Sequence, residues 1–300
     1  MDLTPTSLQV LFKGFRTIFD SSLQSAPTDW QDIAMRVDSA SAEELYAFLD
    51  ALPGMKEFIG EITIEEATAS EWVIRNKKWQ DTVRVKRENV ERDSYGLYNP
   101  IFSELGMIAR QHPDELVAAL LNNGFTDKDY TGKAFFAENK KHAPNRKGSA
   151  TFSNVTNAAL AEASLTAAIA NIKGRKNGEG RAMKLGRSLQ LIVPPALEQT
   201  GKELLQAEKN ASGATNILRD SAQLKVLPDL TSDTAWFLIE NGRAIRPLIM
   251  QIEVEPQLTT LVDPNNALTF TTDDFFYRVY GRWNAGYGFP QLAYGSSGDA

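Results

Sequence analysis

Cysteine is absent from this 300-residue chain, and histidine occurs only at His112 and His142. The lack of cysteine excludes disulfides, thiolate nucleophiles, zinc–thiolate sites and iron–sulfur clusters. Two histidines so far apart in sequence also make a poor site for a transition metal. We therefore expect neither a metal nor a cofactor, and we expect packing or oligomerisation to hold the protein together.

Long apolar runs and an excess of positive charge are lacking as well. No stretch approaches the roughly 18 apolar residues that a membrane helix needs. The N-terminal sequence MDLTPTSLQVLFKGF also lacks the features of a secretory signal. Acidic residues number 38 against 32 basic ones, for a formal charge of -6, whereas proteins that coat nucleic acid are normally basic. These features predict a soluble protein from a reducing compartment, without membrane contact, whose contact with nucleic acid would be local.

The motifs of common enzyme classes are missing too. No G-x-S-x-G elbow occurs, and no acid or serine is marked as a partner for either histidine. The segment 132–134 ends like a phosphate-binding loop but lacks the hydroxyl residue. Adjacent carboxylates such as Asp273 and Asp274 point apart rather than flank a substrate. We expect a protein that is not an enzyme, with His112 capping a helix break or facing solvent and His142 in a polar loop.

One short segment, residues 127–138 with the sequence DKDYTGKAFFAE, matches a calcium-binding EF-hand loop. The matching residues are Asp127, Asp129, Thr131, Gly132 and Glu138. However, Thr131 carries no charge, a poor helix follows, and the sequence contains no second loop as a partner. We instead expect a turn at Gly132 with positive φ and solvated carboxylates on Asp127 and Asp129. The expected core residues of this segment are Tyr130, Phe135 and Phe136.

Apolar periodicity predicts a mixed α+β fold, and 42 % hydrophobic residues suffice for a sizeable core. The expected helices cover residues 4–18, 41–53, 97–125, 160–173 and 198–207. A buried strand is expected at 189–193, a strand pair within 222–239, and further strands in the C-terminal third. Residues 27–40 look irregular, and we find no internal repeat.

The most basic segment covers residues 71–92, where alternating apolar residues predict two strands joined into a hairpin around 76–78. Such a hairpin is only marginally stable alone. It is either a solvated ribbon or an arm that docks on a neighbouring subunit or on nucleic acid. In the nucleic-acid alternative, Trp72 and Trp79 would stack on bases. The candidate contact residues are Trp72, Arg75, Lys77, Lys78, Trp79, Arg84, Lys86 and Arg87.

Several segments, in the same order along the chain, resemble the major head subunit of Mu-like tailed phages. They are YTGKAFF at 130–136, GLYNPIFSELG at 96–106, LIVPPALE at 191–198, RPLIMQ at 246–251 and RWNAGYG at 282–288. Two departures are Thr131, where the family has Asp, and His142, which is displaced and followed by Ala143 instead of Pro. The resemblance spans roughly residues 4–296.

This resemblance implies the α+β Hong Kong 97-type phage capsid fold. Residues 1–65 would form an N-terminal arm and residues 66–95 an extended β-hairpin loop. Residues 96–130 would be the peripheral domain with its long spine helix. The axial domain would take most of 131–275, and 276–300 would return towards the peripheral domain.

The implied function is self-assembly as hexamers and pentamers into the icosahedral head shell of a virion. Double-stranded DNA would be enclosed without sequence-specific contact. The family implies a scaffold, a maturation protease and a portal protein as partners, with assembly in the bacterial host cytoplasm or from a prophage. The basic hairpin would contact the acidic body of a neighbour, with Trp72 and Trp79 as anchors. Packing within one subunit is the open alternative for both tryptophans.

Overall fold

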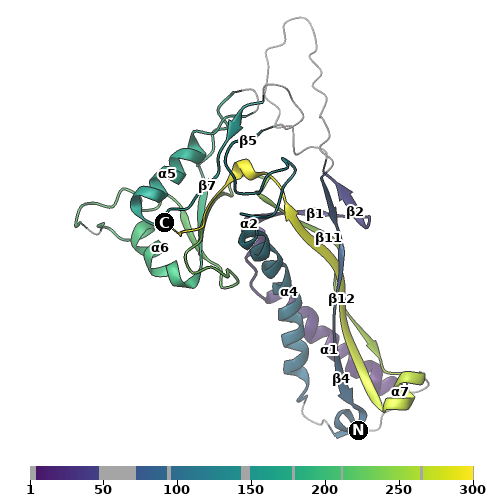
Figure 1. Ribbon diagram of the computed structural model, residues 1–300. Coiled ribbons are helices and arrows are strands. Elements are labelled where there is room, and N and C mark those ends of the chain that lie inside the picture. Colours follow the sequence, from purple (N-terminus) through teal and green to yellow (C-terminus); the bar gives the residue numbers. More distant parts are fainter. Residues whose placement is uncertain are drawn as a thin grey trace, which may run out of the picture.

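The computed structural model describes residues 5–46, 72–92, 96–142, 149–177, 180–210, 212–263 and 266–299. These residues form an elongated body and a more compact one, each built around its own sheet (Figure 1). The elongated body holds a four-stranded sheet in the order β1-β11-β12-β4. Its strands are β1 (Ala34–Asp38), β11 (Leu248–Leu261), β12 (Asp274–Tyr287) and β4 (Lys77–Lys86).

Helix α4 (Asn99–Asn122) and helix α1 (Pro5–Ser25) pack together over this sheet. Phe102, Leu105 and Ala109 of α4 are buried at helical spacing. Where the two helices cross, Gly106 lies so close to α1 that a Cβ would stand 2.6 Å from the carbonyl oxygen of Phe19. Pro113 inside α4 does not end the helix. The predicted helix over 97–125 is therefore confirmed as one long element.

The compact body holds a five-stranded sheet in the order β7-β13-β10-β8-β9. Its strands are β7 (Val155–Thr156), β13 (Ala293–Ser296), β10 (Trp236–Glu240), β8 (Leu189–Val193) and β9 (Gln223–Val226). Every residue of β8 and β10 is buried, as continuous apolar runs predict for central strands. Helices α5 (Glu162–Lys173) and α6 (Glu198–Leu205) belong to this body.

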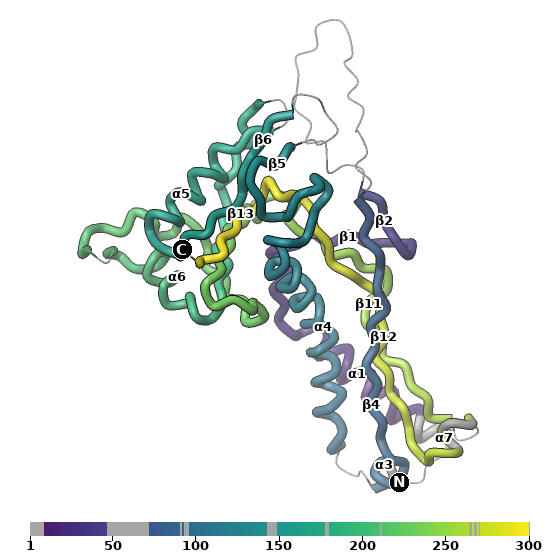
Figure 2. The backbone as a smooth tube through the Cα atoms, in the orientation of Figure 1, coloured from purple at the N-terminus to yellow at the C-terminus, as the bar shows by residue number. Residues whose placement is uncertain are grey.

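The C-terminal segment joins the two bodies. Figure 2 shows β12 along the elongated body and the chain continuing to β13 in the compact one. Short elements complete the fold. They are α2 (Trp30–Ile33), β2 (Glu43–Leu45), β3 (Val73–Arg75), α3 (Arg87–Arg92), β5 (Lys140–Lys141), β6 (Thr151–Phe152), α7 (Ala267–Thr272) and the 3-10 turns Pro195–Leu197 and Pro290–Leu292.

Several predicted pairings and elements are wrong. Residues 71–92 do not fold into a hairpin, because β3 pairs with β2 and β4 pairs with β12. Strands β9 and β10 do not pair with each other, since β8 lies between them. The predicted helix over 41–53 is a strand at Glu43–Leu45, and its residues 47–53 lie outside the described part of the chain. The stretch predicted as irregular, 27–40, contains α2 and β1.

Among the residues that the structure describes, three isolated antiparallel bridges join positions six residues apart: Lys128 with Ala134, Lys176 with Ala182, and Lys209 with Thr215. In each case, the residue after the first of these positions is Asp129, Asn177 or Asn210, and its backbone N–H donates to the carbonyl oxygen of the residue four positions later. Each of these segments contains a glycine with positive φ, at 78°, 79° and 80°. The sequences KDYTGKA, KNGEGRA and KNASGAT share this spacing, so the chain does contain a short repeat.

Candidate intersubunit interface

Strand β4 lies at one edge of the four-stranded sheet and is paired along one side with β12. Its alternate residues face either the helices or solvent; Val85 is buried, whereas Lys78, Arg84 and Lys86 are exposed. Lys78 lies opposite Arg282 and Thr82 lies opposite Arg278, and cross-strand partners share a face. The solvent side of this sheet is therefore cationic. We call Lys78, Arg84, Lys86, Arg278 and Arg282 the basic sheet face.

Charges on the basic sheet face are only partly paired. Arg84 contacts Asp274 at 3.5 Å, and Arg282 contacts Glu253 at 2.8 Å. Lys78 and Lys86 form no ion pair with any residue in the described ranges. Net positive charge therefore remains available on the surface of a protein whose formal charge is -6.

The other predicted contact residues are spread over several elements. Arg75 on β3 pairs with Glu43 at 3.0 Å, and Arg87 at the start of α3 pairs with Asp273 at 3.4 Å. Such exposed pairs typically contribute only about 0–1 kcal/mol. Lys77 is exposed and lies opposite Trp283 in the register of β4 with β12. The structure thus collects Lys78, Arg84 and Lys86 on one face but not the remaining candidates.

Both candidate tryptophans are half-buried within the subunit. The Trp72 Nε1–H donates to the carbonyl oxygen of Tyr287 at 3.1 Å, and the Trp79 Nε1–H donates to that of Trp283 at 2.8 Å. These bonds show intramolecular packing for both side chains. Their role as anchors against a neighbouring subunit stays a prediction.

His112 does not cap a helix break or face solvent, so that prediction is wrong. Its ring centroid lies 4.3 Å from that of Trp79, and its Nδ1 accepts a hydrogen bond from the Trp283 Nε1–H at 3.1 Å. Burial lowers the pKa of His112. The uninterrupted helix places this side chain between the two tryptophans.

A buried ion pair occupies the segment that resembles a calcium loop. The Lys140 ammonium is fully buried and contacts Asp129 Oδ2, together with the carbonyl oxygens of Ala134 at 2.8 Å and Phe135 at 2.9 Å. The other Asp129 oxygen accepts hydrogen bonds from the backbone and hydroxyl of Thr131. Burial lowers the pKa of Lys140, while the charge of Asp129 opposes that shift.

The structure tests the predictions made for residues 127–138. Tyr130, Phe135 and Phe136 are buried, and φ at Gly132 is 78°, so those predictions are confirmed. Asp127 is exposed as expected, but the prediction of a solvated Asp129 is wrong. The Asp129 carboxylate is paired with the Lys140 ammonium within the subunit. The structure shows no cluster of three or more potential metal ligands among the residues it describes.

A second buried cation, Arg175, lies next to this loop in the compact body. Its guanidinium donates to the carbonyl oxygens of Pro290, Gln291 and Ala293 and to Asn171 Oδ1. His142 lies outside the helices and strands, as predicted, but its side chain is buried, and its ring lies 4.6 Å from that of Phe152. Burial, with a smaller effect from the nearby Arg175 charge, lowers the pKa of His142 to about 4. No sequence motif indicated that Arg175 would contact residues 290–293, which lie far away in the chain.

Comparison with known proteins places this architecture in a family. A model of the Mu-like prophage major head subunit gpT matches residues 8–159, 155–230 and 228–299. The chain belongs to this family. The resemblance found in the sequence is therefore confirmed.

None of the described helices of this head subunit is long and apolar enough to cross a membrane.

Two curated relatives match over almost the whole length of this head subunit. The Mu-like prophage FluMu major head subunit of Haemophilus influenzae is 28% identical over 99% of this chain and 75% of its own. The major capsid protein of Escherichia phage Mu is 28% identical over 100% of this chain and 76% of its own.

A solved structure confirms the predicted capsid fold. The procapsid of bacteriophage JBD30 contains a chain that is 27% identical, with a TM-score of 0.62. The match covers 98% of the present chain and 76% of that chain. The head subunit therefore has the Hong Kong 97-type α+β fold of phage capsid proteins.

Proposed function

We propose that this chain is the major capsid protein of a Mu-like phage and that its copies assemble, through hexamers and pentamers, into an icosahedral head shell. The observation that carries this proposal is the family match along nearly the whole chain. The chain would reside in the virion, after assembly in a bacterial host cytoplasm or from a prophage. Double-stranded DNA would be enclosed without sequence-specific contact. The role is structural rather than catalytic.

The two bodies suggest how the rings are built. Heterologous contacts between identical subunits close into rings when the rotation between neighbours allows it. The compact body with the five-stranded sheet would be the axial domain, and the elongated body with α4 as its spine helix the peripheral domain. The extended-loop assignment to 66–95 depended on a hairpin that does not form, because β4 belongs to the elongated sheet. Residues 66–71 and 93–95 of that assignment lie outside the described part of the chain.

Contact between neighbouring subunits would use the basic sheet face. Because the chain carries a net charge of -6, the positive charge of this face is complementary to the negative charge of the remaining surface of another copy. Trp72 and Trp79 would support β3 and β4 from within and anchor a neighbour with their exposed edges. A scaffold, a maturation protease and a portal protein would complete the assembly system.

Electron microscopy and light scattering of the purified full-length chain test this proposal. We expect shells, tubes or capsomer rings, alone or with phage partner proteins. A strictly monomeric species under all conditions, including material taken from virions, would contradict it. A nucleic-acid-binding module would instead bind DNA without forming particles. Microscopy and light scattering of the same preparations distinguish these two outcomes.

A further inference from the structure

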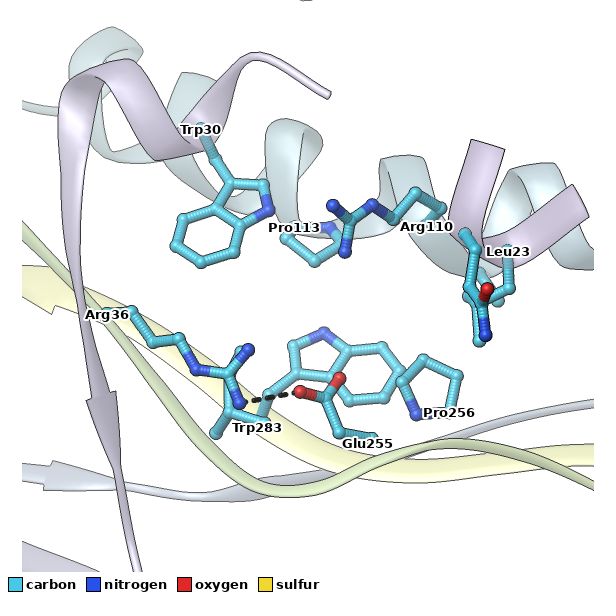
Figure 3. Close-up of a pocket in the computed structure, with 11 residues that line it drawn as sticks. Leu23, Trp30, Arg36, Arg110, Pro113, Glu255, Pro256 and Trp283 are labelled. Atoms are coloured by element: carbon cyan, nitrogen blue, oxygen red, sulfur yellow. Dashed lines mark ion pairs between the residues drawn. The ribbon is translucent and has the colours of Figure 1, made fainter. Parts of the chain in front are cut away.

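A cavity of about 320 Å³ lies between the helices and the sheet of the elongated body. Figure 3 shows Arg110 and Pro113 of α4 on one side of the cavity, with Arg36, Glu255 and Trp283 on the opposite side. Trp30 closes the end nearest α2. Its size lies at the lower end of the range for ligand pockets, about 300–1,000 Å³.

Irregular pairing of β11 shapes the sheet side of the cavity. The register of β11 with β12 shifts between Ile252 and Val254 and again between Val254 and Gln257. Pro256 lies within the second shift and has no backbone N–H to donate. Such bulges bend a strand and redirect its side chains, and here Glu255 lines the cavity with its carboxylate towards Arg36.

The two arginines of the cavity differ in their partners. Arg36 is paired with Glu255 at 2.6 Å and with Asp38 at 2.8 Å. Arg110 forms no hydrogen bond or ion pair with any described residue, and its Nε atom is buried without an acceptor. Buried donors in folded proteins almost always have a partner. Because Nε itself is buried, an external acceptor would contact the Nη groups of this unpaired guanidinium.

We propose that this cavity binds one carboxylate, carried on an apolar peptide segment from a second copy of the chain. A guanidinium presents a planar fork of donors that fits a carboxylate. Trp30, Trp283 and Ile252 supply apolar walls for the neighbouring side chains of the peptide. A nucleic-acid backbone fits less well, because only one guanidinium is unpaired and Glu255 repels further phosphates.

The chain itself contains a segment with the required chemistry. Residues 57–66 read EFIGEITIEE, with glutamates interleaved with Phe58, Ile59, Ile62 and Ile64 and with no basic residue. These residues lie outside the described part of the chain. Their acidic and apolar character complements the cavity. This choice of occupant rests on the proposed function, because only an assembly of copies would present the segment of one chain to the cavity of another.

A peptide-binding measurement tests the site directly. A fluorescent synthetic peptide EFIGEITIEE is titrated with the full-length chain, kept unassembled by dilution, and fluorescence anisotropy is recorded. We expect saturable binding that Arg110→Gln weakens at least about tenfold, because a charge-assisted hydrogen bond is lost. The matched control is Arg16→Gln, an exposed arginine on α1 that does not line the cavity. It should bind as the unmodified chain does, and thermal unfolding shows whether each variant is folded.

Two further measurements remain decisive even if Arg110→Gln fails to fold. The peptide QFIGQITIQQ should bind the unmodified chain at least about tenfold more weakly, since it has no carboxylate side chain. Glu255→Gln should bind the acidic peptide more tightly, because it removes the competing carboxylate. Equal binding of both peptides, equal binding by Arg110→Gln, or displacement by an oligonucleotide would overturn the site. Shell formation without saturable peptide binding would refute this inference alone, whereas binding without any shell would refute the proposed function.

Discussion

Lys140 and Lys141 are neighbours on the short strand β5, but only Lys140 is buried. The Lys140 ammonium holds Asp129 and two backbone carbonyl groups. We predict that Lys140→Met lowers the free energy of unfolding by about 3–5 kcal/mol, because it leaves a buried carboxylate without its partner. Lys141→Met should change it by less than about 0.5 kcal/mol. Urea denaturation of the unassembled chains measures both, and equal effects would contradict the structural role of Lys140.

The buried His142 predicts a pH dependence with a defined sign. Its pKa is about 4 in the folded chain, below the ordinary value of 6.5. Between these values the unfolded chain binds a proton that the folded chain does not, so stability falls as pH decreases from 6.5 to 4. His142→Phe keeps an aromatic ring beside Phe152 but cannot bind a proton. Between pH 6.5 and 4, its free energy of unfolding should therefore fall by about 3 kcal/mol less than that of the unmodified chain. Urea denaturation at several pH values tests this, and parallel pH profiles would contradict it.

At the residue scale, the sequence predicted apolar burial better than polar burial. Phe135 and Phe136 could be assigned to the core because large aromatic side chains are usually buried. Asp129 could not, since a carboxylate is buried only where a cation meets it. That cation comes from Lys140, which no motif marks as its partner. The glycine at 132 was predictable because its turn needs positive φ.

At the element scale, the crossing of α1 and α4 depends on one glycine. A Cβ on Gly106 would stand 2.6 Å from the Phe19 carbonyl oxygen and 3.0 Å from the Leu23 nitrogen. Gly106→Ala should therefore force the helices apart and destabilise the chain by about 1–3 kcal/mol. Gly14→Ala, on α1 where a Cβ meets nothing within 4 Å, should stabilise by about 0.5–1 kcal/mol. Thermal unfolding measures both changes, and a stabilising Gly106→Ala would show that the crossing can relax.

Element types were more predictable than element partners. The long helix 97–125 and the strand 189–193 follow from apolar spacing and are confirmed within a few residues. The basic segment 71–92 also alternates as strands do, yet alternation identifies only the buried face of a strand. The strand that pairs with β4 is β12, which is far away in sequence. The burial of Val85 among residues of α1 and α4 holds β4 beside β12. The prediction of strands within 71–92 was therefore correct, but the prediction that these strands pair with each other was wrong.

At the scale of the whole molecule, charge is distributed unevenly between the two sides of the elongated body. The helix side buries its apolar residues against the sheet, whereas the opposite side carries the basic sheet face. In an isolated chain this cationic surface faces water. In a shell it would face a copy with a net negative charge, so the same distribution becomes a source of attraction between subunits.

This distribution predicts the behaviour of a charge reversal. The double variant Lys78→Glu/Lys86→Glu changes two exposed residues without an ion pair to any described residue, so its unfolding should match the unmodified chain within about 0.5 kcal/mol. Its assembly should need a higher protein concentration, because each contact loses about 0.2–1 kcal/mol and every subunit repeats the loss.

Salt separates this electrostatic cause from a packing defect. Assembly of the unmodified chain should weaken between low salt and 1 M salt, where the Debye length falls to about 3 Å, and the double variant should respond less. Lys13→Glu, an exposed lysine on the helix side, is the control and should keep the salt response of the unmodified chain. Light scattering at matched concentrations measures all three chains. Equal assembly and equal salt response of the double variant would show that the basic sheet face lies outside the subunit contacts.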